Sequence, residues 1–351
     1  MPTNQHLSRA AIPLLSVLLL AADAPGPAPV AIRAAWKKGD KIDLVIEKRK
    51  EDSRKPESAR IAFRMEARIE VLEKDETGYL LQWTYGKSDI EAPHLTKEMK
   101  EFLLKSLAPV LSIMEGLAMR IRTDADGSPT GLENIDEMQK KMREAMEVLL
   151  REQKKGAGEK PETMQKILDE ILKPETLETI ILKEPTAFLA AAGCSFTDGK
   201  ANEGDVELPN PFGGEPIPSR CTVTLKESLP EEAKAVVEIR QVPHPEKASA
   251  IIAASLNEMA RRMGGPPIPA DKMPKMEIES SIRCVVDTAT GWPRSVEAVQ
   301  RVKADSDQKI ERMTIRVASP AAPAPGEPQP PPESPPAPSG SETPPPTSPK
   351  P

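Results

Sequence analysis

The residue types that most often carry out catalysis are scarce in this chain. Histidine occurs only at His6, His94 and His244, and the last two lie beside prolines in expected loops. The sequence contains no Gly-x-Ser-x-Gly or His-Glu-x-x-His motif, no Walker loop and no dinucleotide fingerprint. A carboxylate pair assembled by the fold is the remaining catalytic alternative, because Asp and Glu total 54. We expect a protein that is not an enzyme, with no catalytic residue and no cofactor.

One stretch resembles the start of a metal-binding loop, namely Asp124-Ala125-Asp126-Gly127. A calcium loop of the EF-hand type also needs a third acidic ligand and a distant glutamate. Both are missing here. Asp and Gly are also the residues that favour a β-turn. We therefore expect a plain turn at this position and no metal ligand in the chain.

Three cysteines, Cys194, Cys221 and Cys284, lie in the second half of the sequence. An oxidising compartment favours a disulfide, and an odd number leaves one thiol over. We expect Cys194 to pair with Cys221, because these two flank a loop rich in Pro and Gly, and Cys284 to be a buried free thiol in a strand. The alternative, three reduced and buried thiols, fits the sequence as well.

The first secondary-structure elements expected along the chain are β-strands. Apolar residues occupy every second position of residues 59–72, a period of two that predicts a β-strand with one buried and one solvated face. At about 3.3 Å per residue this strand would be roughly 40 Å long. Similar alternation at residues 42–46 and 79–85 predicts three consecutive antiparallel strands.

The middle of the chain has helical spacing instead. We expect helices over residues 95–117, 133–155, from Pro161, and over 174–182, 186–192 and 248–263, with an acidic, turn-rich loop between Cys194 and Cys221. Further strands are expected near 221–225 and 235–242 and over 276–286, 294–302 and 309–317. The predicted fold class is α+β: a long, curved antiparallel sheet, similar to an unclosed barrel, with several helices packed on its apolar face.

Methionine is used often, with 14 residues, and many of them fall on expected helix faces. Such stripes usually form ordinary core, but Met also lines surfaces that accept varied apolar partners. The second interpretation predicts an apolar cleft between helices and sheet, suited to a lipid or acyl chain. Its expected lining is Phe63, Met65, Trp83, Met138, Met142, Met146 and Met259.

The two ends of the chain have compositions of their own. Arg9 and the apolar residues 10–22 resemble a secretory signal peptide, too short to span a membrane; an uncleaved N-terminal helix is the alternative. Beyond residue 318 the chain is rich in Pro, Ala and Ser, which predicts a disordered tail. We expect a signal peptide at 1–24, a linker at 25–34, a single domain at 35–318 and a tail at 319–351.

Three motifs, in this order along the chain, resemble an exported bacterial family of unknown function. They are Trp36-x-x-Gly39-Asp40, then Thr123-Asp124-x-Asp126-Gly127 followed by Leu132-Glu133-Asn134, and finally Asp287-Thr288-x-Thr290-Gly291-Trp292-Pro293. The likeness covers residues 36–317 and implies export and a β-rich fold, but no catalytic residue. More distantly, the predicted architecture is similar to the half-barrels of periplasmic lipoprotein carriers, a likeness of outline only.

Composition also argues against one class of partner. Charged residues make up 29% of the chain, the net charge is only −6 and aromatics are 3%, so we expect no nucleic-acid partner. The sequence predicts a periplasmic or extracellular, non-enzymatic, envelope-associated protein that binds a hydrophobic small molecule or lipid. The alternative is an envelope scaffold whose Pro-rich tail contacts an envelope protein or the cell wall.

Overall fold

The computed structural model describes residues 30–54, 62–92, 96–98, 101, 115–153, 169, 172–196, 201–208, 210, 214–262, 265–269, 276–305 and 307–318. The chain divides into two units, residues 1–318 and 319–351, and every described residue belongs to the first. The expected signal peptide, the helices expected over 95–117 and from Pro161, and the Pro-rich tail lie wholly or mostly outside the described residues.

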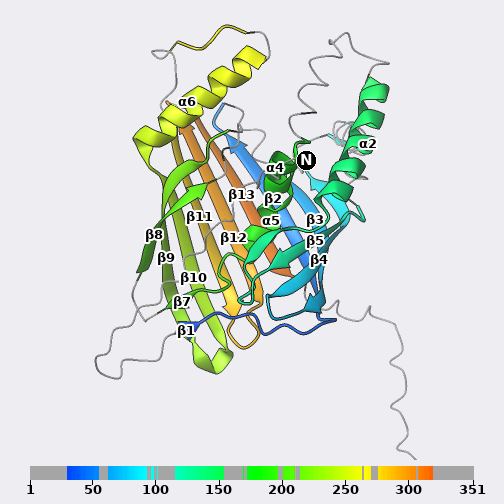
Figure 1. Cartoon of the computed structure of the whole chain (residues 1–351), viewed down its shortest axis with the longest axis vertical. Helices are drawn as coiled ribbons and strands as arrows, with labels where there is room; N and C mark the ends of the chain where they lie inside the picture. The colour runs from blue at the N-terminus through cyan, green and yellow to red at the C-terminus, as the bar shows by residue number, and fades with distance from the viewer. Residues whose placement is uncertain are drawn as a thin grey trace, which may run out of the picture. The chain divides into compact units, whose positions relative to one another are not determined.

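Eleven of the described strands form one antiparallel sheet (Figure 1), in the order β6-β5-β4-β3-β2-β13-β12-β11-β10-β9-β8. Their bounds are β2 Lys41–Asp52, β3 Ala62–Lys74, β4 Tyr79–Glu91, β5 Ala118–Thr123, β6 Pro129–Leu132, β8 Ala201–Leu208, β9 Ile217–Leu229, β10 Lys234–Pro243, β11 Met276–Asp287, β12 Pro293–Ala304 and β13 Asp307–Val317. The two expected sets of strands meet where β13 pairs with β2. The prediction of a long, curved, open antiparallel sheet is confirmed.

One face of the sheet, the outer face, is covered by charged side chains that pair across strands. Arg68 Nε lies 2.6 Å from Asp43 Oδ1, and Arg312 Nε lies 3.2 Å from Glu51 Oε1. Arg240 on β10 makes the same kind of contact with β11. Opposite charges on neighbouring strands stabilise a sheet and keep its exposed face wet. The period of two read from the sequence therefore separates this face from an apolar one.

The opposite face, the inner face, carries the core and the helices. Their bounds are α2 Ile135–Gln153, α4 Pro174–Ile181, α5 Lys183–Phe188 and α6 Pro245–Arg262, with a short 3₁₀ turn at Pro230–Glu232. Figure 1 shows α6 across one end of the long strands and α5 over their middle. A large core forms beneath α4 and α5, and a small separate one, built on Ile217, Ala248 and Ile252, beneath α6.

Two of these elements correct the sequence interpretation. The acidic stretch expected as a loop contains β8, an edge strand, whose exposed Glu203, Asp205 and Glu207 resemble loop composition but also protect a sheet edge from further pairing. Helix α5 begins at Lys183, three residues before the predicted start, because Pro185 falls in its first turn, where no backbone donor is needed.

A second, two-stranded sheet pairs β1 (Val30–Ala31) with β7 (Ser195–Phe196). Residues 30–34, expected as part of a linker, therefore belong to the fold, and Ile32 is buried in the main core. None of the described helices is long and apolar enough to cross a membrane.

Candidate functional site

Strand register places six residues in one line across the inner face, which we call the polar row. Each residue is the register partner of the next: Cys221, Gln241, Ser280, Gln300, Glu311 and Lys50. The first five are half-buried and Lys50 is exposed. This row separates the apolar side chains that pack near α5 from those that pack beneath α6.

Towards α5 the polar row borders the apolar row, which consists of Val223, Ile239, Ile282, Ala298 and Met313. Ile239 and Met313 are buried, whereas Val223, Ile282 and Ala298 are only half-buried. On the other side of the polar row, Ile278 packs against the small core under α6. Partly exposed apolar side chains therefore flank the polar row on both sides.

At the β2 end of these rows lies a buried carboxylate. Glu184, in the first turn of α5, is 5% exposed. It forms an ion pair with Lys48 on β2 and accepts a hydrogen bond from the Tyr85 hydroxyl on β4 at 3.1 Å. Burial, reinforced by the charge and hydrogen bond of Glu184, raises the pKa of Tyr85 well above its ordinary value of 10. The tyrosine therefore remains a neutral hydrogen-bond donor.

The neighbouring residue of α5 reaches the polar row itself. Lys183 Nζ lies 2.8 Å from Glu311 Oε1. Burial opposes the ionisation of Glu311, but the hydrogen bond from Lys183 and the positive charges of Lys183, Lys50 and Lys48 outweigh it, so the pKa of Glu311 falls below its ordinary value. Three lysines and two glutamates thus lie close together where the polar row and the apolar row reach β13 and β2.

The residues expected to line an apolar cleft occupy several environments. Met65, Trp83 and Met138 are buried in the main core, where the Trp83 ring meets Phe188 edge-on with 6.0 Å between ring centroids. Met142 is half-buried against the same core. Phe63 and Met146 are also half-buried, and the side chain of Met259 lies outside the described residues. Their role as cleft lining stays a prediction.

The three cysteines are free thiols in the structure. Burial, with a smaller contribution from Cys221, raises the pKa of Cys194 to about 12; burial, with Cys194 nearby, raises that of Cys284 to about 12. The expected Cys194–Cys221 bond is not formed in this structure and stays a prediction.

The three motifs behind the family resemblance converge at one end of the sheet, around the strap, as we call residues 30–36. The Trp36 ring stacks on Trp292, with 4.0 Å between centroids and 15° between planes, and lies 4.9 Å from Tyr79. Ala34 N donates to Asp126 O at 3.2 Å and Ala35 N to Thr290 O at 3.0 Å. The strap therefore ties together two distant turns.

Glycine is required where the strap crosses the β5–β6 turn. Gly127 has a φ of +95°, and a Cβ added there would lie 2.7 Å from the Trp36 ring. Asp124 Oδ1 in the same turn accepts hydrogen bonds from Asp126 N and Ser128 N. This carboxylate stabilises a β-turn, as predicted. No group of three His, Cys, Asp or Glu side chains within the described ranges is arranged to hold a metal ion.

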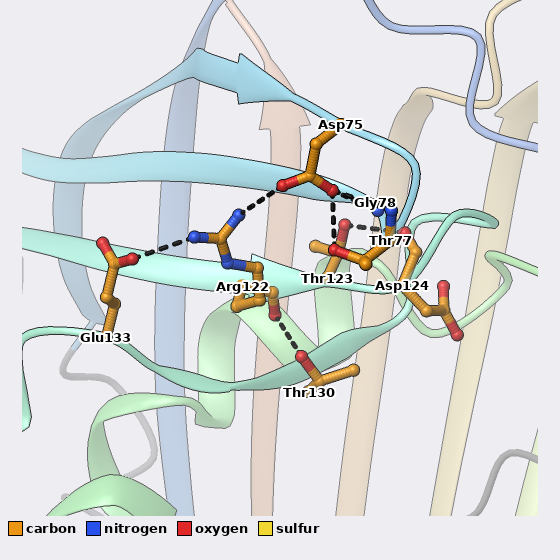
Figure 2. A network of polar contacts seen from close by, with 8 residues as sticks. All are labelled: Asp75, Thr77, Gly78, Arg122, Thr123, Asp124, Thr130 and Glu133. Carbon is orange, nitrogen blue, oxygen red and sulfur yellow. Dashed lines mark hydrogen bonds and ion pairs between the residues drawn. The ribbon is translucent and has the colours of Figure 1, made fainter.

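Beside this turn, Arg122 on β5 links two acidic residues (Figure 2). Its guanidinium donates to Asp75 at 3.3 Å and to Glu133 at 2.9 Å. Asp75 also accepts hydrogen bonds from Thr77 and from Gly78 N, and these bonds hold its pKa below the ordinary value. These bonds connect the β3–β4 turn to β5 and to the residue after β6, so the network stabilises two neighbouring hairpins.

The charged residues beside α5 were missed by the sequence interpretation. A signal existed, because Lys48 and Lys50 continue the alternation of buried Leu44 and Ile46 on β2. Glu311 likewise continues that of Met313 and Ile315 on β13. Charged residues in phase with core positions indicate an inner face that turns polar.

Comparison with known proteins gives little guidance. No family model and no curated protein sequence matches the chain. A solved structure of lipovitellin, reported for its lipid–protein interactions, is similar with a TM-score of 0.37 and 9% sequence identity, over 82% of this chain and 26% of that one. The chain thus spans about a quarter of the lipovitellin chain, and a TM-score of this size supports no transfer of function. The resemblance to an exported family stays a prediction.

Proposed function

We propose that this is an exported, non-enzymatic binding protein of the bacterial envelope, which receives an apolar ligand on the inner face of its sheet. The observation that carries the proposal is the half-buried state of Val223, Ile282 and Ala298, in a row where Ile239 and the end residue Met313 are buried. Apolar surface left partly exposed within an otherwise covered face is typical of ligand-binding surfaces.

Contrast between the two faces of the sheet supports this assignment. Charged residues on the outer face are largely paired across strands, as in Arg68–Asp43 and Arg240–Glu279, so that face is adapted to water. The inner face has helices over two separate regions, with the apolar and polar rows between α5 and α6. Because apolar side chains there would gain from being covered, an apolar ligand fits this place better than water does.

Purified protein should carry extractable lipid or take up a fluorescent fatty acid such as cis-parinaric acid. Native mass spectrometry before and after organic extraction tests the first point, and a fluorescence titration the second. Protein that emerges ligand-free and gives no saturable fluorescence change contradicts the proposal. Deletion of residues 319–351 should leave the binding unchanged.

A bulky side chain on the inner face should block the ligand. We expect Ala298→Trp to reduce fatty-acid binding at least tenfold, because the new ring would fill the middle of the apolar row. The matched control is Ser281→Trp, which places the same ring on the outer face of the adjacent strand β11. Circular dichroism checks that both variants fold, and Ala298→Leu provides a milder inner-face change. Equal binding by inner-face and outer-face variants would contradict this location.

A further inference from the structure

We propose that the ligand is a single-chain amphiphile with an anionic head group, held at Lys50 and Lys183 with its chain along the apolar row. This inference rests on the proposed function and adds the ligand class. It begins from the position of the lysines, which stand at one end of the row and not along it. An amphiphile needs this asymmetry, with a charged site at one end of an apolar track.

Positive charges outnumber negative charges at this end of the apolar row. Lys48 pairs with Glu184, and Lys183 pairs with Glu311. Lys50, the register partner of Glu311, is exposed and adds a positive charge beside that pair. The five residues therefore leave one positive charge in excess, in a chain whose net charge is −6. An anionic head group would satisfy Lys50 and share Lys183 with Glu311, whereas a cationic one would be repelled.

One acyl chain would cover the part of the apolar row that lies nearest the lysines. A bilayer core of about 30 Å is two chains thick, so one chain extends about 15 Å. Neighbouring strands lie about 4.8 Å apart, and three such spacings give about 14 Å. Counted from β2, three spacings cross β13 and β12 and reach β11. Ala298 on β12 and Ile282 on β11 supply the half-buried apolar contacts, and Met313 on β13 is buried beside them.

The polar row would run alongside the chain. Gln300 and Ser280 continue from Glu311 across β12 and β11. Their amide and hydroxyl groups need water or a polar partner, so the chain is expected to lie on the α5 side of the row. This places the ligand between the polar row and the covered core.

The test compares palmitate with hexadecanol and hexadecylamine, which have the same chain length and different head groups. We measure each by competition with cis-parinaric acid. Palmitate should bind at least tenfold more tightly than the alcohol, and its affinity should fall as salt is raised, because salt screens exposed charges. The alcohol should show little salt dependence.

Two variants should shift palmitate affinity in opposite directions. Lys50→Gln removes the excess charge and should weaken palmitate about fivefold, whereas Glu311→Gln releases Lys183 and should strengthen it by a similar factor. Hexadecanol should respond to neither. The matched control is Arg312→Gln, next to Glu311 on the outer face, where its partner is Glu51. If Glu311→Gln does not fold, Lys50→Gln and the salt titration decide the question.

The outcomes separate this inference from the proposed function. Equal binding of palmitate and hexadecanol, or tighter binding of hexadecylamine, overturns the anionic head group and leaves an apolar-ligand protein. An unchanged palmitate affinity in Lys50→Gln overturns the location. If none of the three compounds binds, the proposed function fails together with the inference.

Discussion

Replacing Lys48 by Met should be among the most destabilising single changes on the inner face. It would leave the carboxylate of Glu184 buried without its cation. Removing one partner of a buried ion pair costs about 3–5 kcal/mol. Because 24% of the Lys48 side chain reaches solvent and the Tyr85 hydrogen bond remains, we expect the lower limit, about 3 kcal/mol. For a domain of this size that loss lowers Tm by about 6 °C.

Urea unfolding followed by circular dichroism, with calorimetry for Tm, measures this loss. The matched control is Lys41→Met on the outer face, which breaks an exposed ion pair of 3.3 Å with Glu70. Screening by water limits its effect to about 0.5 kcal/mol. The double variant Lys48→Met/Glu184→Gln removes the buried charge but keeps an oxygen that accepts from Tyr85, and we expect it to recover about 2 kcal/mol.

Two results would refute this reasoning. One is a Lys48→Met variant that loses less than about 1 kcal/mol, which would mean that water reaches Glu184. The other is a double variant whose loss is the sum of the two single losses within about 0.5 kcal/mol, since such additivity means that the two residues do not interact.

Three further predictions concern other parts of the chain. Gly127→Ala should lose at least about 2 kcal/mol more stability than Gly39→Ala in urea unfolding, because both have positive φ but only the first meets a tryptophan ring; equal losses would contradict the close approach. The lysine neighbours of Glu311 lower its pKa in the folded protein, although burial opposes this shift. The ionised carboxylate therefore stabilises the fold above about pH 4.3, the ordinary pKa of glutamate, and this stabilisation is lost as the pH falls through the lower pKa of the folded state. The stability advantage of wild type over Glu311→Gln should therefore shrink between pH 5 and pH 3, and a growing advantage would refute it. Burial raises the pKa of Cys194 to about 12, so folded protein should react slowly with Ellman's reagent at pH 8, and the thiol count after unfolding shows whether Cys194 and Cys221 are bonded.

The strands could be predicted because each carries its own signal. Alternation in β3 and β4 depends only on which face is buried, and Ile69, Val71 and Trp83 are buried as expected. The edge strand β8 was missed because neither of its faces joins the main core. It is held in the sheet by pairing with β9, and the local sequence pattern cannot reveal such a pairing.

The candidate site was harder to predict because its residues come from distant parts of the chain. Glu184 lies in the first turn of a short helix, and its sequence neighbourhood gives no sign that it meets Lys48, which is 136 residues away. The rows on the inner face exist only once all strand registers are fixed. The surroundings of the strap could not be predicted for the same reason. Each of the three motifs can be recognised in the sequence, but that they lie together depends on tertiary contacts.

The pairing of β2 with β13 places the first and last long strands side by side at the centre of the sheet. During synthesis, β2 must therefore wait for some 260 intervening residues before its β13 neighbour exists. The stack of Trp36 on Trp292 imposes the same delay on the strap. Folding dominated by such distant contacts is slow, and the half-made sheet exposes an unpaired edge that can aggregate. We expect nascent chains of this protein to depend on a holding chaperone until the last strand arrives.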